Sequence, residues 1–187
     1  MRHLTLFLAL SGFCSLLSAA TFDESIGVSL PDEIAGLPFK DRKVFPQKEL
    51  GVNYAWQSAS LRGSLYVYTG GEKNIPAGHD NEVVQRHFAK VLDEAKAMEK
   101  LGKVRAVNMP SGMKQTTKYP GCGPQFVWSA FEMDMTEQVI ASSTYLTAIN
   151  GNFVKLRVHY PKGDEQGHKT ALLFVEKIRK VLGKCTD

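Results

Sequence analysis

Aromatic and cationic side chains alternate along two segments that have the pattern of β-strands. Tyr66 and Tyr68 share one face of the first segment, while Lys155, Arg157 and His159 share one face of the second. If that sheet face stays uncovered, the rings and cations form an amphipathic platform for a ligand or a partner protein. The alternative is packing across neighbouring strands, together with the other aromatic residues of the predicted sheet, Tyr54, Trp56 and Trp128.

Paired carboxylates are the other groups with catalytic potential. Glu132 and Asp134 share one face of a predicted strand, and Asp32 is followed by Glu33, so either pair could flank a glycosidic bond. Solvent-facing acidic pairs are common, however, and no serine lies in a G-x-S-x-G elbow. The catalytic residues of any reaction stay unknown at this point. An exported hydrolase with an unrecognised site is the alternative to a binding protein.

Metal and cofactor motifs are absent from the sequence. Beyond the N-terminal segment the histidines are His79, His87, His159 and His168, and no two have the i,i+4 spacing that puts ligands on one helix face. There is no calcium loop, and Gly70-Gly71 lacks the pattern of a phosphate-binding loop. We therefore expect no metal site and no cofactor, with the four histidines scattered over the surface.

Residues 1–20 have the succession of segments that is typical of a secretory signal peptide. A basic start is followed by the apolar run Leu4–Leu10 and by Ser18-Ala19-Ala20, which places small residues before a cut at Thr21. A membrane anchor is the alternative, but serines and a glycine interrupt the apolar stretch. The position before Cys14 holds Phe13, which does not fit lipidation. We expect a periplasmic or secreted protein without stable membrane insertion after cleavage, and residues 21–187 as one domain.

Cys122 and Cys185 are the two cysteines left after signal cleavage. Two cysteines in an exported protein most simply pair with each other. Catalytic or metal-binding thiols are the alternatives, but the chain has no C-x-x-C pair to support them. The sequence therefore predicts a disulfide that ties the C-terminus to a mid-chain turn.

The formal net charge of +4 is mildly basic, and charges of both signs alternate along the chain. The densest basic cluster, Lys177-Ile178-Arg179-Lys180 with Lys184, lies in the last turns of a predicted helix. Cations there complement the helix dipole, so we interpret the cluster as a solvated helix end. Because no nucleic-acid-binding signature accompanies it, we expect no nucleic-acid partner.

Several short strands are predicted from alternating hydrophobicity. They include a hairpin formed by 51–57 and 61–69, and a second hairpin, 139–149 with 152–160, joined by Asn150-Gly151. Asn-Gly favours a tight turn because both residues accept positive φ. Weaker or shorter strands are expected at 26–30, 39–45, 104–118 and 125–133.

Two amphipathic helices are predicted. The first follows a cap at Asp80 or Asn81 and ends near Gly102; the second covers 165–182. The order of strands, helix, strands and helix predicts an α+β fold, with an antiparallel sheet covered on one face by both helices.

Three short segments, Gly51-Val-Asn-Tyr54, Leu65-Tyr-Val-Tyr68 and Ile75-Pro-Ala-Gly78, are followed by a long helix. This series resembles a group of exported bacterial proteins without assigned activity. The later hairpin and closing helix resemble the PsbP-like α+β arrangement in topology. The resemblance implies a sheet packed against helices and transfers no catalytic residues.

Taken together, these patterns favour an exported binding or accessory module without catalysis. Its partner would be an envelope protein or a small ligand, bound at the sheet face or at the 70–80 loop. A structural component of the envelope is a further alternative.

Overall fold

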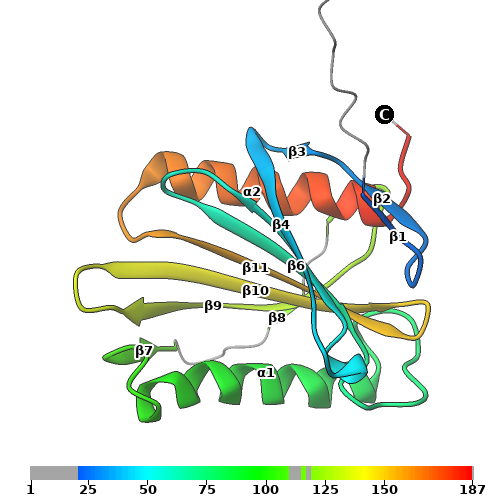
Figure 1. Cartoon of the computed structure of the whole chain (residues 1–187), viewed down its shortest axis with the longest axis horizontal. Helices are drawn as coiled ribbons and strands as arrows, with labels where there is room; N and C mark the ends of the chain where they lie inside the picture. The colour runs from blue at the N-terminus through cyan, green and yellow to red at the C-terminus, as the bar shows by residue number, and fades with distance from the viewer. Residues whose placement is uncertain (1–20, 110–114, 117–118, 187) are drawn as a thin grey trace, which may run out of the picture.

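The computed structural model describes residues 21–109, 115–116 and 119–186 (Figure 1). The predicted signal peptide, residues 1–20, lies outside these described residues. Strands, a helix, further strands and a second helix follow each other along the chain, which confirms the α+β class. Within the described ranges no helix is long and apolar enough to cross a membrane.

A twisted antiparallel sheet forms the centre of the molecule. Among the described residues it has nine strands in the order β3-β4-β5-β6-β11-β10-β9-β7, with β8 also paired to β9. The strands are β3 (Glu33–Ile34), β4 (Leu37–Val44), β5 (Val52–Gln57), β6 (Arg62–Tyr68), β7 (Ala106–Asn108), β8 (Gln115–Thr116), β9 (Val127–Asp134), β10 (Val139–Ile149) and β11 (Asn152–Pro161). Two short strands, β1 (Thr21–Asp23) and β2 (Val28–Leu30), pair separately.

The hairpin of β10 and β11 has the predicted turn and register. Asn150 and Gly151 adopt φ values of 48° and 72°, the left-handed conformation that this two-residue turn requires. Ile149 pairs with Asn152 and Tyr145 with Leu156, as the turn length dictates. The β5–β6 hairpin is confirmed as well. β6 and β11, distant in sequence, pair side by side and join the two hairpins into one sheet.

Both helices begin at capping side chains. The Asn81 side-chain oxygen accepts a 3.0 Å hydrogen bond from the Val84 N–H at the start of α1 (Glu82–Lys100). Asp164 accepts a 2.9 Å bond from the Gly167 N–H at the start of α2 (Glu165–Leu182). Each cap satisfies a backbone donor that has no partner within the helix.

The helices cover opposite faces of the sheet (Figure 1), so the prediction that both pack on one face is wrong. In β11, Val154 and Leu156 contact the core beneath α2, whereas Phe153 contacts the core beneath α1. Apolar residues therefore point to both sides of the central strand. Each side must be shielded from water, which one helix on each face achieves.

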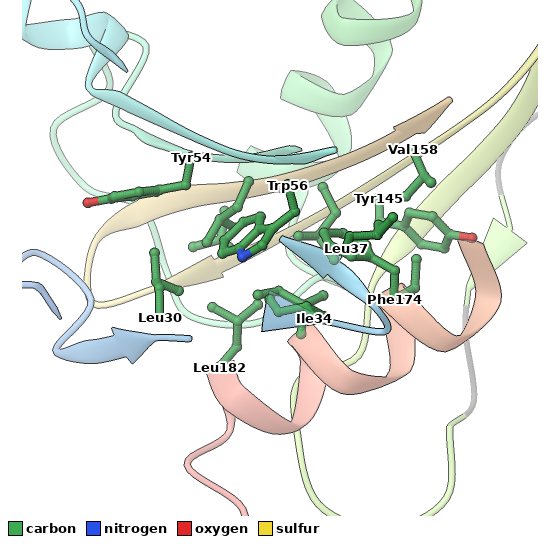
Figure 2. Close-up of a cluster of buried hydrophobic side chains, with 14 of the residues drawn as sticks. Leu30, Ile34, Leu37, Tyr54, Trp56, Tyr145, Val158, Phe174 and Leu182 are labelled. Atoms are coloured by element: carbon green, nitrogen blue, oxygen red, sulfur yellow. The ribbon is translucent and has the colours of Figure 1, made fainter. Parts of the chain in front are cut away.

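The larger core lies between the sheet and α2. Figure 2 shows Trp56 of β5 beside Phe174 of α2, in a cluster that also holds Tyr54 and the residues Leu30, Ile34 and Leu37 of the N-terminal strands. The Trp56 indole N–H donates a 2.9 Å hydrogen bond to the Pro31 carbonyl. The N-terminal segment is thus part of the core.

The disulfide between Cys122 and Cys185 is present, as predicted, with the Cα atoms 5.8 Å apart. It joins the loop before β9 to the segment that follows α2. Arg179 strengthens this connection by donating hydrogen bonds of 3.1 and 3.4 Å to the carbonyls of Pro120 and Gly123. Lys177 is exposed, as expected of a solvated helix end, but Arg179 is only 3% exposed, which corrects the prediction at that residue.

Candidate functional site

The structure brings the predicted binding residues together on the sheet face that α1 partly covers. Lys155 of β11 pairs directly with Tyr66 of β6, and His159 pairs with Arg62. Tyr68 lies beside Phe153 in the same pairing. Because side chains alternate along a strand, Tyr66, Tyr68, Lys155, Arg157 and His159 all project to this one side.

Lys155 lies over aromatic rings. Its ammonium nitrogen is 4.7 Å from the ring centroid of Tyr66 and 5.4 Å from that of Tyr68. Burial, together with the positive charge of Arg157, lowers the pKa of the Lys155 ammonium to about 8. The side chain is half-buried, and no carboxylate of the described residues lies within ion-pair distance of it.

Arg157 is the second half-buried cation on this face. Its guanidinium carbon is 5.8 Å from the Phe131 ring centroid, and Nη2 lies 3.5 Å from the Met133 sulfur. Its Nε is buried and has no hydrogen-bond partner within the described part of the chain. Burial lowers the pKa of Arg157, although a guanidinium keeps its charge across the ordinary pH range.

Further buried polar atoms without hydrogen-bond partners in the ranges that the structure describes lie near Arg157 on the same sheet face. The hydroxyls of Ser129 and Ser142 and the Nδ1 of His159 are buried and make no hydrogen bond to the described residues. Ser142 pairs with His159 across β10 and β11, and Ser129 pairs with Thr144, which in turn pairs with Arg157. Burial and the nearby cations lower the pKa of His159 to about 3, so its ring is neutral at physiological pH.

His87 of α1 also belongs to this site, so the prediction that the histidines are scattered over the surface is wrong for His87 and His159. Its ring stacks on Phe153 with centroids 3.9 Å apart, and Nε2 shares a 2.9 Å hydrogen bond with the Tyr68 hydroxyl. Burial lowers the pKa of His87 to about 4 and raises the pKa of Tyr68. The available sequence signal was helical spacing, because His87, Val91 and Glu94 follow one another along one edge of the apolar stripe.

Two adjoining cavities open along α1 and form what we call the α1 groove. The Arg157 cavity, about 210 Å³, lies between α1 and the sheet and is lined by Val91, Glu94, Ala95, Met98, Phe131, Thr144, Lys155 and Arg157. The Tyr66 cavity, about 400 Å³, is lined by Phe45, Glu49, Leu50, Tyr66, Tyr68, Gly70, His87, Lys90, Glu94 and Lys155. Lys155 and Glu94 line both cavities and mark where they meet.

The acidic sequence candidates Glu132 and Asp134 lie outside the groove. Glu132 pairs with Lys162 at 2.9 Å, and Asp134 pairs with Arg105 at 2.8 Å, so each carboxylate has its own cation. The 70–80 loop contributes Gly70 to the lining of the Tyr66 cavity, and it is attached to the sheet because Gly78 and Ala148 exchange two backbone hydrogen bonds. Within the described ranges, no three His, Cys, Asp or Glu side chains are grouped in a way that could hold a metal ion.

No protein-family model matches the chain, and no curated protein matches it significantly. Function must therefore be inferred from the groove itself. Fold and site together define an α+β domain with one helix on each face of its sheet and a cation-lined groove beside α1.

Proposed function

We propose that this protein is an exported, non-catalytic binding domain that takes a small anionic ligand into the α1 groove. The observation that carries the proposal is the position of Lys155 and Arg157. Both cations are half-buried on one face of β11, and neither has a carboxylate partner among the described residues.

Removing a charge from water without a counter-charge is unfavourable, and buried charges in proteins are normally paired. An anion bound between Lys155 and Arg157 would supply the missing counter-charge. The Nε of Arg157, which lines the groove, is a further donor that lacks a partner in the described chain. This surplus of donors and positive charge favours an anionic ligand over a cationic one.

Export is supported by two independent features. The Cys122–Cys185 disulfide is of a kind that persists in oxidising compartments, and residues 1–20 have a signal-peptide pattern. A small ligand is favoured over an envelope protein because the cations line cavities beside α1, which a large flat partner surface would not reach.

Hydrolysis receives less support from the contacts at the candidate residues. The Ser142 hydroxyl lies opposite His159, but it is buried and forms no hydrogen bond with that ring. An activated serine needs such a contact with its base. Glu132 and Asp134 are held by separate cations, which leaves binding as the activity that the geometry favours.

The proposal is tested by titrating isotope-labelled protein with sodium acetate, benzoate and phosphate and following amide shifts by NMR. We expect shifts at β11 and α1, with at least one anion bound about tenfold more weakly by Arg157→Met or Lys155→Met. Lys162→Met, on the opposite face, is the matched control and should bind like the wild type. Failure of all three anions to bind, or equal binding by all variants, would refute the proposal.

A further inference from the structure

We infer that the ligand of the α1 groove is an elongated monoanion with a carboxylate head in the Arg157 cavity and a flat, uncharged, apolar tail in the Tyr66 cavity. This inference rests on the proposed function and specifies its ligand class. It follows from the unequal size, charge and lining of the two cavities.

The Arg157 cavity fits the head. Its lining contains Lys155 and Arg157 against the single carboxylate of Glu94, which leaves one surplus positive charge. Its volume of about 210 Å³ is small, and Val91 and Phe131 close its apolar walls. Arginine presents two parallel N–H groups that match the two oxygens of a carboxylate.

The Tyr66 cavity fits the tail. It is about twice as large, and the rings of Phe45, Tyr66 and Tyr68 and the side chain of Leu50 give it apolar walls. Leu50 is 45% exposed, and it lies on the 3-10 helix η1 (Lys48–Leu50) that borders the cavity. Aromatic walls favour a planar group that can stack on them.

The balance of charged side chains in the Tyr66 cavity explains why the tail is uncharged. In the Tyr66 cavity the carboxylates of Glu49 and Glu94 balance the ammonium groups of Lys90 and Lys155. This cavity therefore offers no surplus positive charge to a second anionic group. A dicarboxylate or polyphosphate would have to place its additional charge there without compensation.

The test is an NMR titration with acetate, phenylacetate, 3-phenylpropionate and 4-phenylbutyrate. We expect affinity to rise from acetate to the phenylalkanoates by more than tenfold, since each buried methylene contributes about a fourfold gain. Terephthalate, a rigid aromatic dianion, should bind at least about tenfold more weakly than 3-phenylpropionate. Phenethylamine, with the charge reversed, should not bind.

Substitutions at two exposed leucines test the tail site separately from the head site. Leu50→Asp should weaken the binding of 3-phenylpropionate by about tenfold and leave the binding of acetate unchanged. Arg157→Met should weaken the binding of both anions. Leu173→Asp, at an exposed position on α2, is the matched control and should change neither. Circular dichroism checks that each variant is folded.

The outcomes distinguish the two proposals. Equal affinities for acetate and 3-phenylpropionate, or Leu50→Asp binding like the wild type, would overturn the inference about the tail while anion binding stands. Absence of binding for every anion would refute both.

Discussion

Lys155 and Tyr66 are direct cross-strand partners, and the Lys155 ammonium lies 4.7 Å from the centre of the Tyr66 ring. An aromatic face attracts a cation and supplies part of the stabilisation that a carboxylate would otherwise give. It also leaves the ammonium without a counter-ion. The pair therefore keeps a positive charge ready beside both cavities of the α1 groove.

Replacing Lys155 by methionine should raise the free energy of unfolding at pH 7, because the apolar stem is kept and a half-buried charge is removed. The pKa of Lys155 is about 8 in the folded protein against 10.5 ordinarily, so the unfolded chain binds more protons between these values. The contribution of Lys155 to the free energy of unfolding of the wild type therefore rises with pH between about 8 and 10.5. The advantage of Lys155→Met should be largest below pH 8 and shrink towards pH 10.5.

Urea unfolding of both proteins from pH 7 to pH 10 measures this difference directly. Lys162→Met, which removes an exposed ammonium paired with Glu132, is the control for the loss of a lysine charge at the surface. A constant difference between Lys155→Met and the wild type over the range would show that the charge at position 155 is not penalised.

His87 should remain neutral well below the ordinary pKa of histidine. Because its pKa falls from 6.5 to about 4, the unfolded chain binds more protons between these values. The contribution of His87 to stability is therefore complete above pH 6.5 and is lost as pH falls towards 4. NMR of the imidazole nitrogens should show a neutral ring at pH 5.5, and titration near pH 6.5 would contradict the stacked, hydrogen-bonded position.

The disulfide should stabilise the fold without shaping the groove. Replacing both Cys122 and Cys185 by alanine should lower the free energy of unfolding by about 4 kcal/mol on the loop-closure model. Urea denaturation measures the loss, and wild-type protein unfolded with a reductant should match the double variant. Anion binding should be unchanged, because neither cysteine lines either cavity.

Gly63 in β6 allows α2 to approach the sheet. A Cβ atom at this position would lie 2.5 Å from the Phe174 ring, so Gly63→Ala should lower the free energy of unfolding by about 1–3 kcal/mol. Combining it with Phe174→Leu, which makes room, should cost less than the sum of the two single changes. Strict additivity in urea unfolding would show that the two residues do not meet.

Local patterns account for the parts of this fold that the sequence predicted. The Asn150-Gly151 turn determines its own hairpin register, because both φ values are a local property of these two residues. The helices follow from three- and four-residue spacing and from caps such as Asn81. The disulfide could be inferred from two facts alone, the two cysteines left after signal cleavage and the predicted oxidising compartment.

The arrangement of elements could not be predicted in the same way. Which sheet face each helix covers depends on the pairing of β6 with β11, which no local pattern specifies. The groove shares this limitation: strand alternation placed Lys155 beside Arg157, but His87 reaches the site only because α1 crosses that face. The burial of Arg179 has a related cause, since its partners belong to a loop distant in sequence.

Arg179 is expected to hold the loop that carries Cys122. Its guanidinium donates to the Pro120 and Gly123 carbonyls and lies 4.9 Å from the Tyr119 ring centroid. Arg179→Met should lower the free energy of unfolding by about 2 kcal/mol, because charge-assisted hydrogen bonds are lost and two carbonyls lose a donor. Arg179→Lys should restore little of this, since an ammonium lacks the planar fork that reaches both carbonyls.

A double-mutant cycle with the cysteines tests whether Arg179 and the disulfide act on the same loop. In the Cys122→Ala, Cys185→Ala background the loop is free to move away from α2, so Arg179→Met should cost less than in the wild type. Lys177→Met, at an exposed position on the same helix, is the control and should change stability by less than about 0.5 kcal/mol in both backgrounds. An equal cost of Arg179→Met with and without the disulfide, measured by urea unfolding, would show that the guanidinium stabilises the helix end independently of the covalent link.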